Sequence, residues 1–147
     1  MSTRSSSPSR PVQVATDGSA LGNPGPGGWG WCVDSRRQAS GGERHTTNNI
    51  MELVAIREAL VANPGPLEIL TDSQYAINCL TKWLPGWRRR GWKTSSGTPV
   101  KNKDLIVEIA GLLAGRAVTF TWVRGHNGHP LNEAADLLAR TAAEARR

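Results

Sequence analysis

Two aspartates in this sequence each follow a threonine at the end of a short apolar stretch. Asp17 ends an alternation of apolar and polar residues that starts at Val12, and Asp72 follows the apolar segment 67–71. If both segments are neighbouring strands of an α/β sheet, the two carboxylates lie at one edge, where such sheets bind ligands. Like charges at that distance repel, so they persist together only when protonated or bridged by a cation. Singly, each aspartate also fits turn chemistry or a helix N-cap.

Two further acids, Glu52 and Asp136, lie in segments with the apolar spacing of helices. If Asn49 is the N-cap of its helix, Glu52 occupies the third helical position, where a glutamate can cap the helix start. Asp136 has Arg140 four residues later, so a surface ion pair is an alternative to a role in a site. Taken singly, none of the four acids defines a functional site.

Two loops carry residues that could bind phosphate or metal. The Gly- and Pro-rich segment 18–30 lacks the motifs of a P-loop and of a dinucleotide-binding helix, and its prolines oppose a helix, so we interpret it as a turn between strands. His126 and His129 flank an Asn-Gly pair without a nearby cysteine or an H-E-x-x-H spacing, which argues against zinc. Without a metal role, we expect both histidines to be solvated side chains of a loop. His45, just before a helix, is interpreted as structural or close to a phosphate.

The positive charge of the chain is concentrated in one segment. The formal net charge is +6, and residues 82–103 contain seven Lys and Arg, no acid, and three of the six tryptophans. Outside this segment basic and acidic residues nearly balance. Basic and aromatic residues that interleave are typical of a surface that binds a nucleic-acid backbone, the alternative being a solvated charged loop.

Length and composition favour one domain that contains the whole site. The 147 residues suffice for a core without disulfides, so we interpret Cys32 and Cys79 as buried thiols and expect a reducing, cytoplasmic location. No apolar run is long enough to span a membrane, and the first ten residues do not form a secretory signal. We interpret residues 1–10 as a flexible lead-in and residues 11–147 as the domain.

The elements that must position these residues alternate between strand and helix patterns. The order β-β-β-α-β-α-(α)-α-β-α predicts an α/β fold in which helices flank a mixed sheet. We expect strands over 12–17, 27–34, 37–47, 67–71 and 117–123, and helices over 48–63, 73–83, 83–90, 102–115 and 131–147.

Read together, five segments of the sequence resemble type 1 ribonuclease H over about residues 12–140. They are "TDGSALGNPGPGGWG", "TTNNIMEL", "TDSQYAI", the basic segment 82–103, and "WVRGHNGHPLNEAADLLA". The resemblance implies a ribonuclease H-like fold with a five-stranded mixed sheet of order 3-2-1-4-5, antiparallel among its first three strands. It also implies an endonuclease that hydrolyses the RNA strand of RNA/DNA hybrids, leaving a 5′-phosphate and a 3′-hydroxyl.

The resemblance assigns a role to each acid. It makes Asp17, Glu52, Asp72 and Asp136 metal ligands and His126 an auxiliary residue that assists proton transfer or product release. Mg²⁺ prefers oxygen ligands, and two such ions about 4 Å apart can clamp the scissile phosphate. We therefore expect two Mg²⁺ ions during catalysis, with Mn²⁺ as a substitute.

The resemblance also divides the substrate-binding residues between the two strands of the hybrid. The residues implied for the RNA strand are Asn23, Asn48, Asn49 and Gln74. Thr47 and Asn102 resemble a pocket for a DNA phosphate, although His45 stands where some relatives use Arg. The expected surface for the DNA strand and its backbone continues through Trp83 and Trp87 and, in the basic protrusion 82–103, through Arg88, Arg89, Arg90 and Lys93. Pro85-Gly86 departs from the pattern and is expected either to break or to re-aim the helix of the protrusion.

Three alternatives stay open from the sequence. The same fold carries transposases, integrases and junction resolvases, which also bind two metals but lack this protrusion. A catalytically silent module that binds hybrids is the second, and a domain of a longer protein is the third. The expected partner is an RNA/DNA hybrid, with no membrane, no obligate protein partner and a monomeric state.

Overall fold

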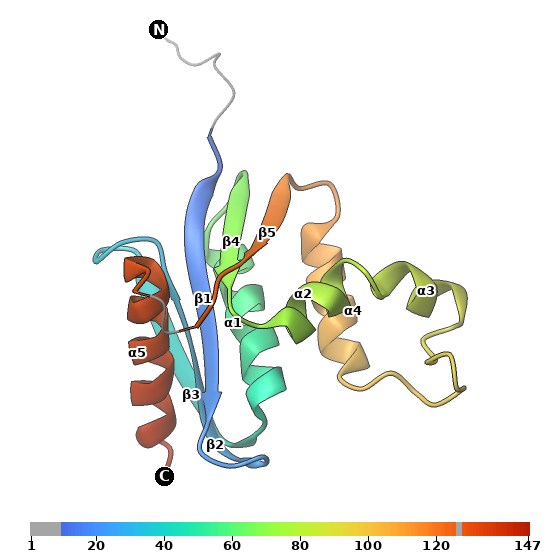
Figure 1. Ribbon diagram of the computed structural model, residues 1–147, viewed down its shortest axis with the longest axis horizontal. Helices are drawn as coiled ribbons and strands as arrows, with labels where there is room; N and C mark the ends of the chain where they lie inside the picture. The colour runs from blue at the N-terminus through green and yellow to red at the C-terminus, as the bar shows by residue number, and fades with distance from the viewer. Residues whose placement is uncertain (1–9, 126–127) are drawn as a thin grey trace, which may run out of the picture.

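The computed structural model describes residues 10–125 and 128–147, and within them strands and helices follow one another in the predicted order (Figure 1). The elements are β1 (Val12–Ala20), β2 (Gly25–Cys32), β3 (Gln38–Thr46), α1 (Asn48–Ala62), β4 (Leu67–Thr71), α2 (Gln74–Leu80), α3 (Leu84–Arg89), α4 (Lys103–Leu113), β5 (Val118–Trp122) and α5 (Pro130–Glu144).

The five strands form one mixed sheet of order β3-β2-β1-β4-β5. The first three pair antiparallel, and β4 pairs parallel with both β1 and β5. This topology confirms the predicted α/β class and strand order. The strand direction changes at β1, which has an antiparallel neighbour on one side and a parallel neighbour on the other.

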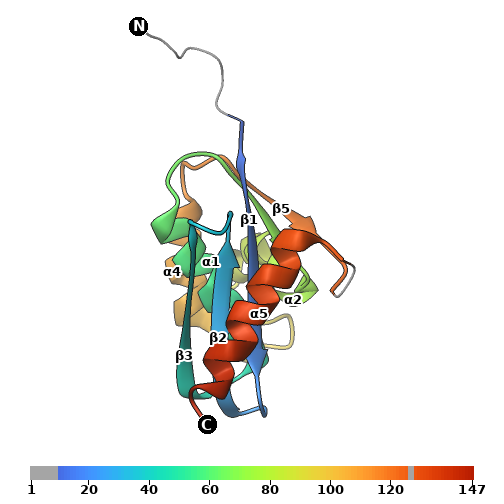
Figure 2. The same ribbon diagram turned by 90° about the vertical axis from the view of Figure 1, so that its left-hand side faces the viewer.

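Helices cover both faces of the sheet, and the alternation of side chains along β1 divides the core between them. Val14 packs in a cluster with residues of α1, α2 and α4, whereas Ala15 packs with Ala135 of α5. Figure 2 shows α5 crossing one face of the sheet while α1 and α4 lie behind the other. Side chains from helices on both faces of the sheet can therefore reach the edge where β4 ends.

The first strand is longer than the sequence predicts, and Asp17 lies inside it rather than at its end. Pairing with β4 covers only Val12–Ala15, but pairing with β2 continues from Ala15 to Ala20. The antiparallel ladder keeps the chain extended after the parallel one has stopped. Asp17 thus sits just beyond the part of β1 that β4 flanks.

The start of α1 also differs from the prediction. Thr47, not Asn49, is the N-cap, and its hydroxyl accepts a hydrogen bond from the Ile50 amide at 3.2 Å. Glu52 is consequently the fifth helical residue and is buried, so the capping interpretation of this glutamate is wrong. Both Thr and Asn are good N-caps, which is why the pattern could not separate them.

The basic protrusion projects from the body beyond α2 and α4 (Figure 1). Pro85 is the second residue of α3, in the first turn, where a missing N–H costs the helix nothing, so Pro85 does not break the helix. After α3, Gly91 and Trp92 both adopt φ of 65°, and this reversal brings the Trp92 ring to 6.5 Å from the Trp87 ring.

Two further predictions concern the cysteines and the possibility of a membrane-spanning segment. Cys32 and Cys79 are both buried free thiols, which confirms their interpretation. Among the described residues, no helix combines the length and the apolar character needed to cross a membrane.

Candidate active site

Three of the predicted acids meet at the edge where β4 ends. One carboxylate oxygen from each of Asp17, Glu52 and Asp72 lies within 4.8 Å of the other two. Asp17 and Glu52 are each only 5% exposed, and Asp72 is half-buried. A strand, a helix and the residue after a second strand each contribute one ligand atom, so the cluster depends on the tertiary fold.

The strand register explains how the two aspartates meet. Ala15 pairs with Leu70, which places Asp17 level with Asp72. Asp72 is not a helix cap, because Ser73 caps α2 through a hydrogen bond from the Ala76 amide to its hydroxyl at 3.0 Å. Asp17 lies within a strand, so neither aspartate keeps the turn or capping role that each could have had singly.

Burial and the neighbouring charges raise the pKa of each carboxyl in the cluster. Burial, followed by the charge of Asp72 and contact with Asp136, raises the pKa of Asp17 from 3.8 to about 8. Burial and the charges of Asp17 and Asp72 raise the pKa of Glu52 well above its ordinary value. Burial also raises the pKa of Asp72, to which the charge of Asp136 adds. Without a cation, the carboxyls share protons at neutral pH.

The donor set fits a hard divalent cation. Glu52 Oε1 is buried and, among the described residues, accepts no hydrogen bond, which is a costly state for a carboxylate oxygen. None of the ion pairs among the described residues involves Asp17, Glu52 or Asp72. A cation that takes oxygen ligands would satisfy all three carboxylates at once.

The fourth predicted ligand, Asp136, approaches the cluster from α5. It lies close enough to raise the pKa of both Asp17 and Asp72, but it is not one of the three acids whose oxygens meet within 4.8 Å. Arg140 donates from Nε to Asp136 Oδ2 at 3.0 Å. The ion pair considered from the sequence is thus present beside the cluster.

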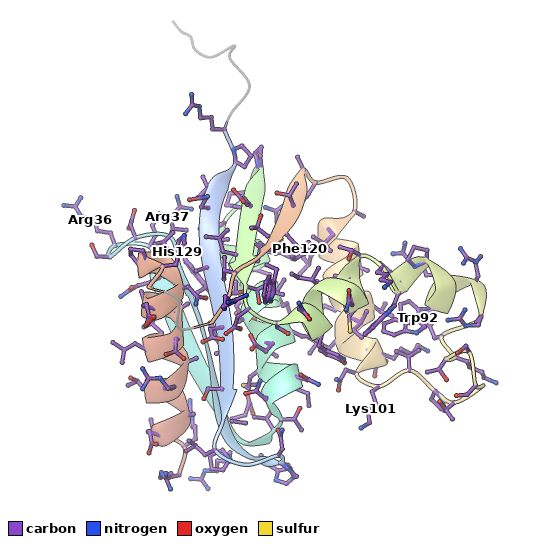
Figure 3. The ribbon with its side chains drawn as sticks, viewed as in Figure 1. Arg36, Arg37, Trp92, Lys101, Phe120 and His129 are labelled. Carbon is purple, nitrogen blue, oxygen red and sulfur yellow. The ribbon has the colours of Figure 1, made fainter. Side chains whose placement is uncertain are left out.

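The predicted auxiliary histidine, His126, lies outside the described residues. The chain just before it passes directly over the cluster, because a Cβ on Gly125 would lie 2.7 Å from Asp72 Oδ2. His129, at the start of α5, is half-buried (Figure 3).

Four of the predicted substrate residues line one cleft of about 390 Å³ beside α1. They are Asn23, Thr47, Asn49 and Asn102. Asn48 and Gln74 do not line this cleft: the Asn48 amide donates to Asn23 Oδ1 at 2.9 Å, and Gln74 is exposed at the start of α2.

Tyr75 is a site residue that the sequence prediction missed. Its hydroxyl accepts a hydrogen bond from Asn102 Nδ2 at 2.9 Å, and its ring lines both this cleft and a neighbouring one of about 430 Å³ that contains Trp87. Burial raises the pKa of Tyr75 to about 12, so the hydroxyl stays protonated. Its position as the only tyrosine in the chain, next to Gln74, was the available signal.

The predicted cations of the protrusion are not equivalent. Arg88, Arg89 and Arg90 are all exposed, but Arg90 Nε also donates to the Lys93 carbonyl at 3.1 Å. The guanidinium of Arg90 also covers Gly86, where a Cβ would lie 3.2 Å from Nη1. Arg90 therefore ties the end of α3 to the chain that follows it.

Aromatic residues connect the protrusion to the clefts. The rings of Tyr75, Trp83, Trp87 and Trp92 form a chain with centroids 5.8–6.5 Å apart. Trp83 is 38% exposed, while Trp87 and Trp92 are half-buried. Figure 3 shows Trp92 within the protrusion and Lys101 extending from its base.

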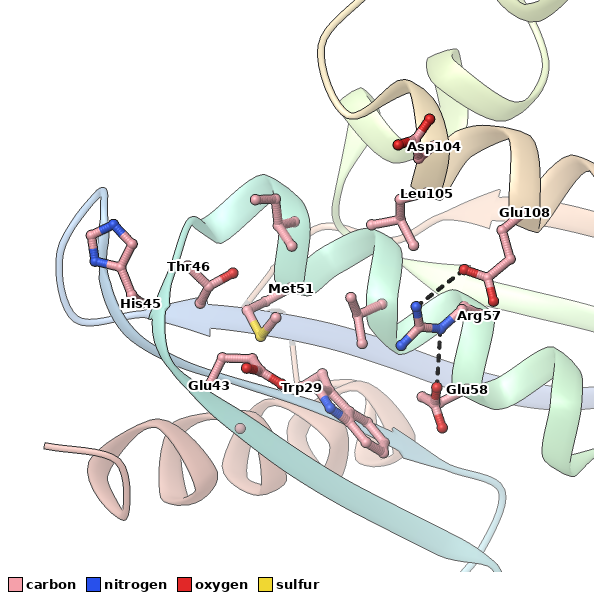
Figure 4. Close-up of a pocket in the computed structure, with 13 residues that line it drawn as sticks. Trp29, Glu43, His45, Thr46, Met51, Arg57, Glu58, Asp104, Leu105 and Glu108 are labelled. Carbon is pink, nitrogen blue, oxygen red and sulfur yellow. Dashed lines mark hydrogen bonds and ion pairs between the residues drawn. The ribbon is translucent and has the colours of Figure 1, made fainter.

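A separate cleft of about 730 Å³ lies between β3, α1 and α4 (Figure 4). Its lining includes four acids, Glu43, Glu58, Asp104 and Glu108, and the last of these and Glu58 both pair with Arg57. An acidic surface repels phosphate, so this cleft is unsuited to a nucleic-acid backbone.

Comparison with known proteins gives one consistent result. A family model described as RNase H matches residues 9–144. A protein named Ribonuclease H from Tropheryma whipplei (strain Twist) is 53% identical over 135 residues, which are 90% of this chain and 84% of the relative. One of the same name from Nitratidesulfovibrio vulgaris (strain Miyazaki F) is 55% identical over 141 residues, 92% of this chain and 90% of the relative.

Two solved structures are also similar to this chain. The crystal structure of LC9-RNase H1, described as a type 1 RNase H with the type 2 active-site motif, has a TM-score of 0.78 at 35% identity and covers 96% of this chain and 76% of its own. A foamy viral protease-reverse transcriptase in complex with dsDNA shares the fold at 24% identity, with a TM-score of 0.77 over 93% of this chain and 99% of its own.

Proposed function

Because this chain belongs to the ribonuclease H family, whose members act on RNA/DNA hybrids, we propose that it cleaves the RNA strand of such hybrids at the carboxylate cluster. The ligands in this proposal are Asp17, Glu52, Asp72 and Asp136. The observation that carries it is the meeting of three buried or half-buried carboxylates within 4.8 Å, none of them in an ion pair among the described residues.

Two Mg²⁺ ions are the proposed cofactors, and Mn²⁺ is the proposed substitute. When bound, they would activate the attacking water and stabilise the leaving 3′-oxygen, giving a 5′-phosphate and a 3′-hydroxyl. In this proposal the protein holds the carboxylates close together in their ionised form, although burial raises their pKa. Glu52 Oε1, which is buried without a donor among the described residues, is the oxygen most in need of such a ligand.

The clefts beside the cluster suit a duplex with two different strands. The amide side chains of Asn23 and Asn49 can contact the 2′-hydroxyl of RNA, which distinguishes it from DNA. We assign Thr47, Asn102 and Tyr75 to a phosphate of the DNA strand and Trp83 and Trp87 to its sugars. Gln74, Asn48, Arg88, Arg89 and Lys93 complete the proposed surface.

Three further parts of the proposal come from the sequence. His126 assists proton transfer or product release, so its replacement by alanine lowers the rate without abolishing it. Residues 11–147 act as one catalytic domain, and the protein works as a monomer. A size measurement in solution tests the last point, because a dimer would contradict it.

The direct test is cleavage of a labelled RNA strand annealed to DNA or to RNA. With Mg²⁺ present, we expect cleavage of the RNA only in the hybrid, and none in EDTA. The control is Asp72→Asn, which is nearly isosteric and should remove cleavage while the hybrid still binds.

Two outcomes would contradict the proposal in different ways. Tight binding of the hybrid by the natural protein without cleavage would indicate a silent binding module. Cleavage by a clean preparation of Asp72→Asn at the natural rate would show that this carboxylate is not a ligand.

A further inference from the structure

Gly18 follows Asp17 on β1 and touches the main chain of α1. A Cβ at this position would lie 2.8 Å from the Met51 oxygen, and closer still to the Met51 carbonyl carbon and the Glu52 nitrogen. All three are backbone atoms, which cannot move aside as the end of a flexible side chain can. At this point β1 and α1 are therefore in direct contact through the peptide that leads into Glu52.

Neither partner in this contact can easily retreat. Gly18 is paired with Trp29 in the ladder between β1 and β2, so it is held within the sheet. Met51 and Glu52 lie in the first half of α1, among residues that are almost fully buried, including Leu53 and Ala55. A methyl group at position 18 would have to push the start of α1 away from the sheet.

The backbone of Gly18 also faces the carboxylates. The Gly18 backbone lowers the pKa of both Asp17 and Glu52, against the larger effect of burial. The same residue thus allows the helix to approach and lies beside two of the acids that the helix and strand bring together.

We propose that Gly18 is a positioning residue for Glu52: its missing side chain sets how closely α1 approaches β1 and so places the Glu52 carboxylate within reach of Asp17 and Asp72. This inference rests on the proposed function only in taking these carboxylates as metal ligands. It adds a specific requirement, because the glycine acts through the position of a helix and touches neither the metal nor the substrate.

A purely structural role would lower stability without selectively weakening the metal site, and Gly42 supplies the matched control. On β3, a Cβ at Gly42 would lie 2.8 Å from the Gly27 oxygen and 2.9 Å from the Ala142 oxygen. Gly42→Ala therefore introduces a backbone clash between the sheet and the C-terminal part of α5, and not between β1 and α1.

The first experiment compares Mg²⁺ binding by calorimetry for the natural protein, Gly18→Ala and Gly42→Ala, each confirmed as folded by circular dichroism. We expect Gly18→Ala to weaken Mg²⁺ binding about tenfold or more, and Gly42→Ala to leave it unchanged. Natural affinity in folded Gly18→Ala would overturn the proposal, as would an equal loss in both variants.

A second variant avoids the clash and keeps the proposal testable if Gly18→Ala does not fold. Glu52→Asp shortens the side chain by one methylene, and because α1 already touches β1 at Gly18, the helix cannot move closer to compensate. We expect Glu52→Asp to weaken Mg²⁺ binding as much as Glu52→Gln. Near-natural affinity in Glu52→Asp would show that the helix has room to move, and the proposal would be wrong.

A failure of the metal assignment can be distinguished from a failure of the positioning role. If the natural protein takes up no Mg²⁺, the proposed function fails, but the amide NMR signals of Met51 and Glu52 still report the position of α1 without metal. Gly18→Ala must shift these signals and Gly42→Ala must not; unshifted signals in folded Gly18→Ala would contradict the positioning role.

Discussion

Asp17 is buried beside other carboxyls, and this makes folding take up a proton. Its pKa rises from 3.8 in the unfolded chain to about 8 in the fold. The stability linked to this proton is fully present below the unfolded pKa and is lost as the pH rises through the folded value. The pKa values of Glu52 and Asp72 shift in the same direction, so the metal-free protein is expected to lose stability between pH 4 and 8.

This expectation can be measured by thermal unfolding in EDTA from pH 5 to pH 9. The Tm of the natural protein should fall more steeply with pH than that of Asp17→Asn, which has no carboxyl to ionise at this position. Saturating Mg²⁺ should restore most of the loss at pH 8, because a bound cation stabilises the ionised carboxylates. Parallel Tm profiles for the two proteins in EDTA would contradict the assigned pKa shift.

At the residue scale, the sequence identified the acids but not the reason they work together. Asp17 and Asp72 stand out because each follows a threonine after an apolar stretch, and the strand register then brings them level. Glu52 had an equally good local explanation as a capping residue, which only the position of Thr47 removes. The importance of Gly18 is invisible in the sequence, since it depends on how close a distant helix lies.

The end of α1 shows how elements depend on distant residues for their stability. The helix has no basic residue in its last turn, yet Arg116 donates to the carbonyls of Leu60, Asn63 and Gly65 at 2.8, 2.6 and 2.9 Å. The Leu60 carbonyl lies in the last turn of α1, where carbonyls lack partners within the helix, and a cation at this end also interacts favourably with the helix dipole. Arg116 therefore fixes the end of the helix whose start carries Glu52.

Replacing Arg116 should destabilise the protein. Arg116→Ala removes three charge-assisted hydrogen bonds, and we expect a loss of about 2–3 kcal/mol in the free energy of unfolding, measured with urea. The control is Arg44→Ala, an exposed arginine without an ion pair among the described residues, for which we expect a change within about 0.5 kcal/mol. Similar losses for both would mean that Arg116 does not stabilise the end of α1.

The protrusion combines binding and structural cations, and two variants separate them. The double replacement Arg88→Ala/Arg89→Ala should weaken hybrid binding, lower the salt slope by about 1 for each cation, and leave tryptophan emission unchanged. Arg90→Ala should alter tryptophan emission, because Arg90 ties Gly86 to Lys93 beside Trp92. An unchanged emission spectrum in Arg90→Ala would place Arg90 among the binding cations instead.

On the scale of the whole molecule, the order and pairing of strands were predictable, but several boundaries were not. The alternation of patterns together with the family resemblance gave the α/β class and the order β3-β2-β1-β4-β5, which the structure confirms. The extension of β1 to Ala20 escaped prediction because it depends on pairing with β2, not on the Gly-rich residues themselves. Tyr75 escaped for a similar reason, since its role follows from the distant Asn102.

The distribution of charge over the molecule leads to a prediction about binding without metal. The basic segment 82–103 attracts the duplex, whereas Asp17, Glu52 and Asp72 form an anionic cluster where the scissile phosphate must lie. In EDTA at pH 9, above the pKa of about 8 for Asp17, this cluster should repel the hybrid. Asp72→Asn should then bind the hybrid more tightly than the natural protein, by about 1 kcal/mol or roughly fivefold in Kd, and Mg²⁺ should reduce the difference.

Fluorescence anisotropy with a labelled hybrid measures this effect, and no cleavage interferes in EDTA. The control, Glu144→Gln, changes the net charge equally but lies near the C-terminus, in an ion pair with Arg147. It should leave the Kd nearly unchanged, because exposed charges far from the phosphate are screened by salt. If both variants tighten binding equally, net charge alone governs the affinity; if only Asp72→Asn does, the local repulsion at the cluster is what a divalent cation has to overcome.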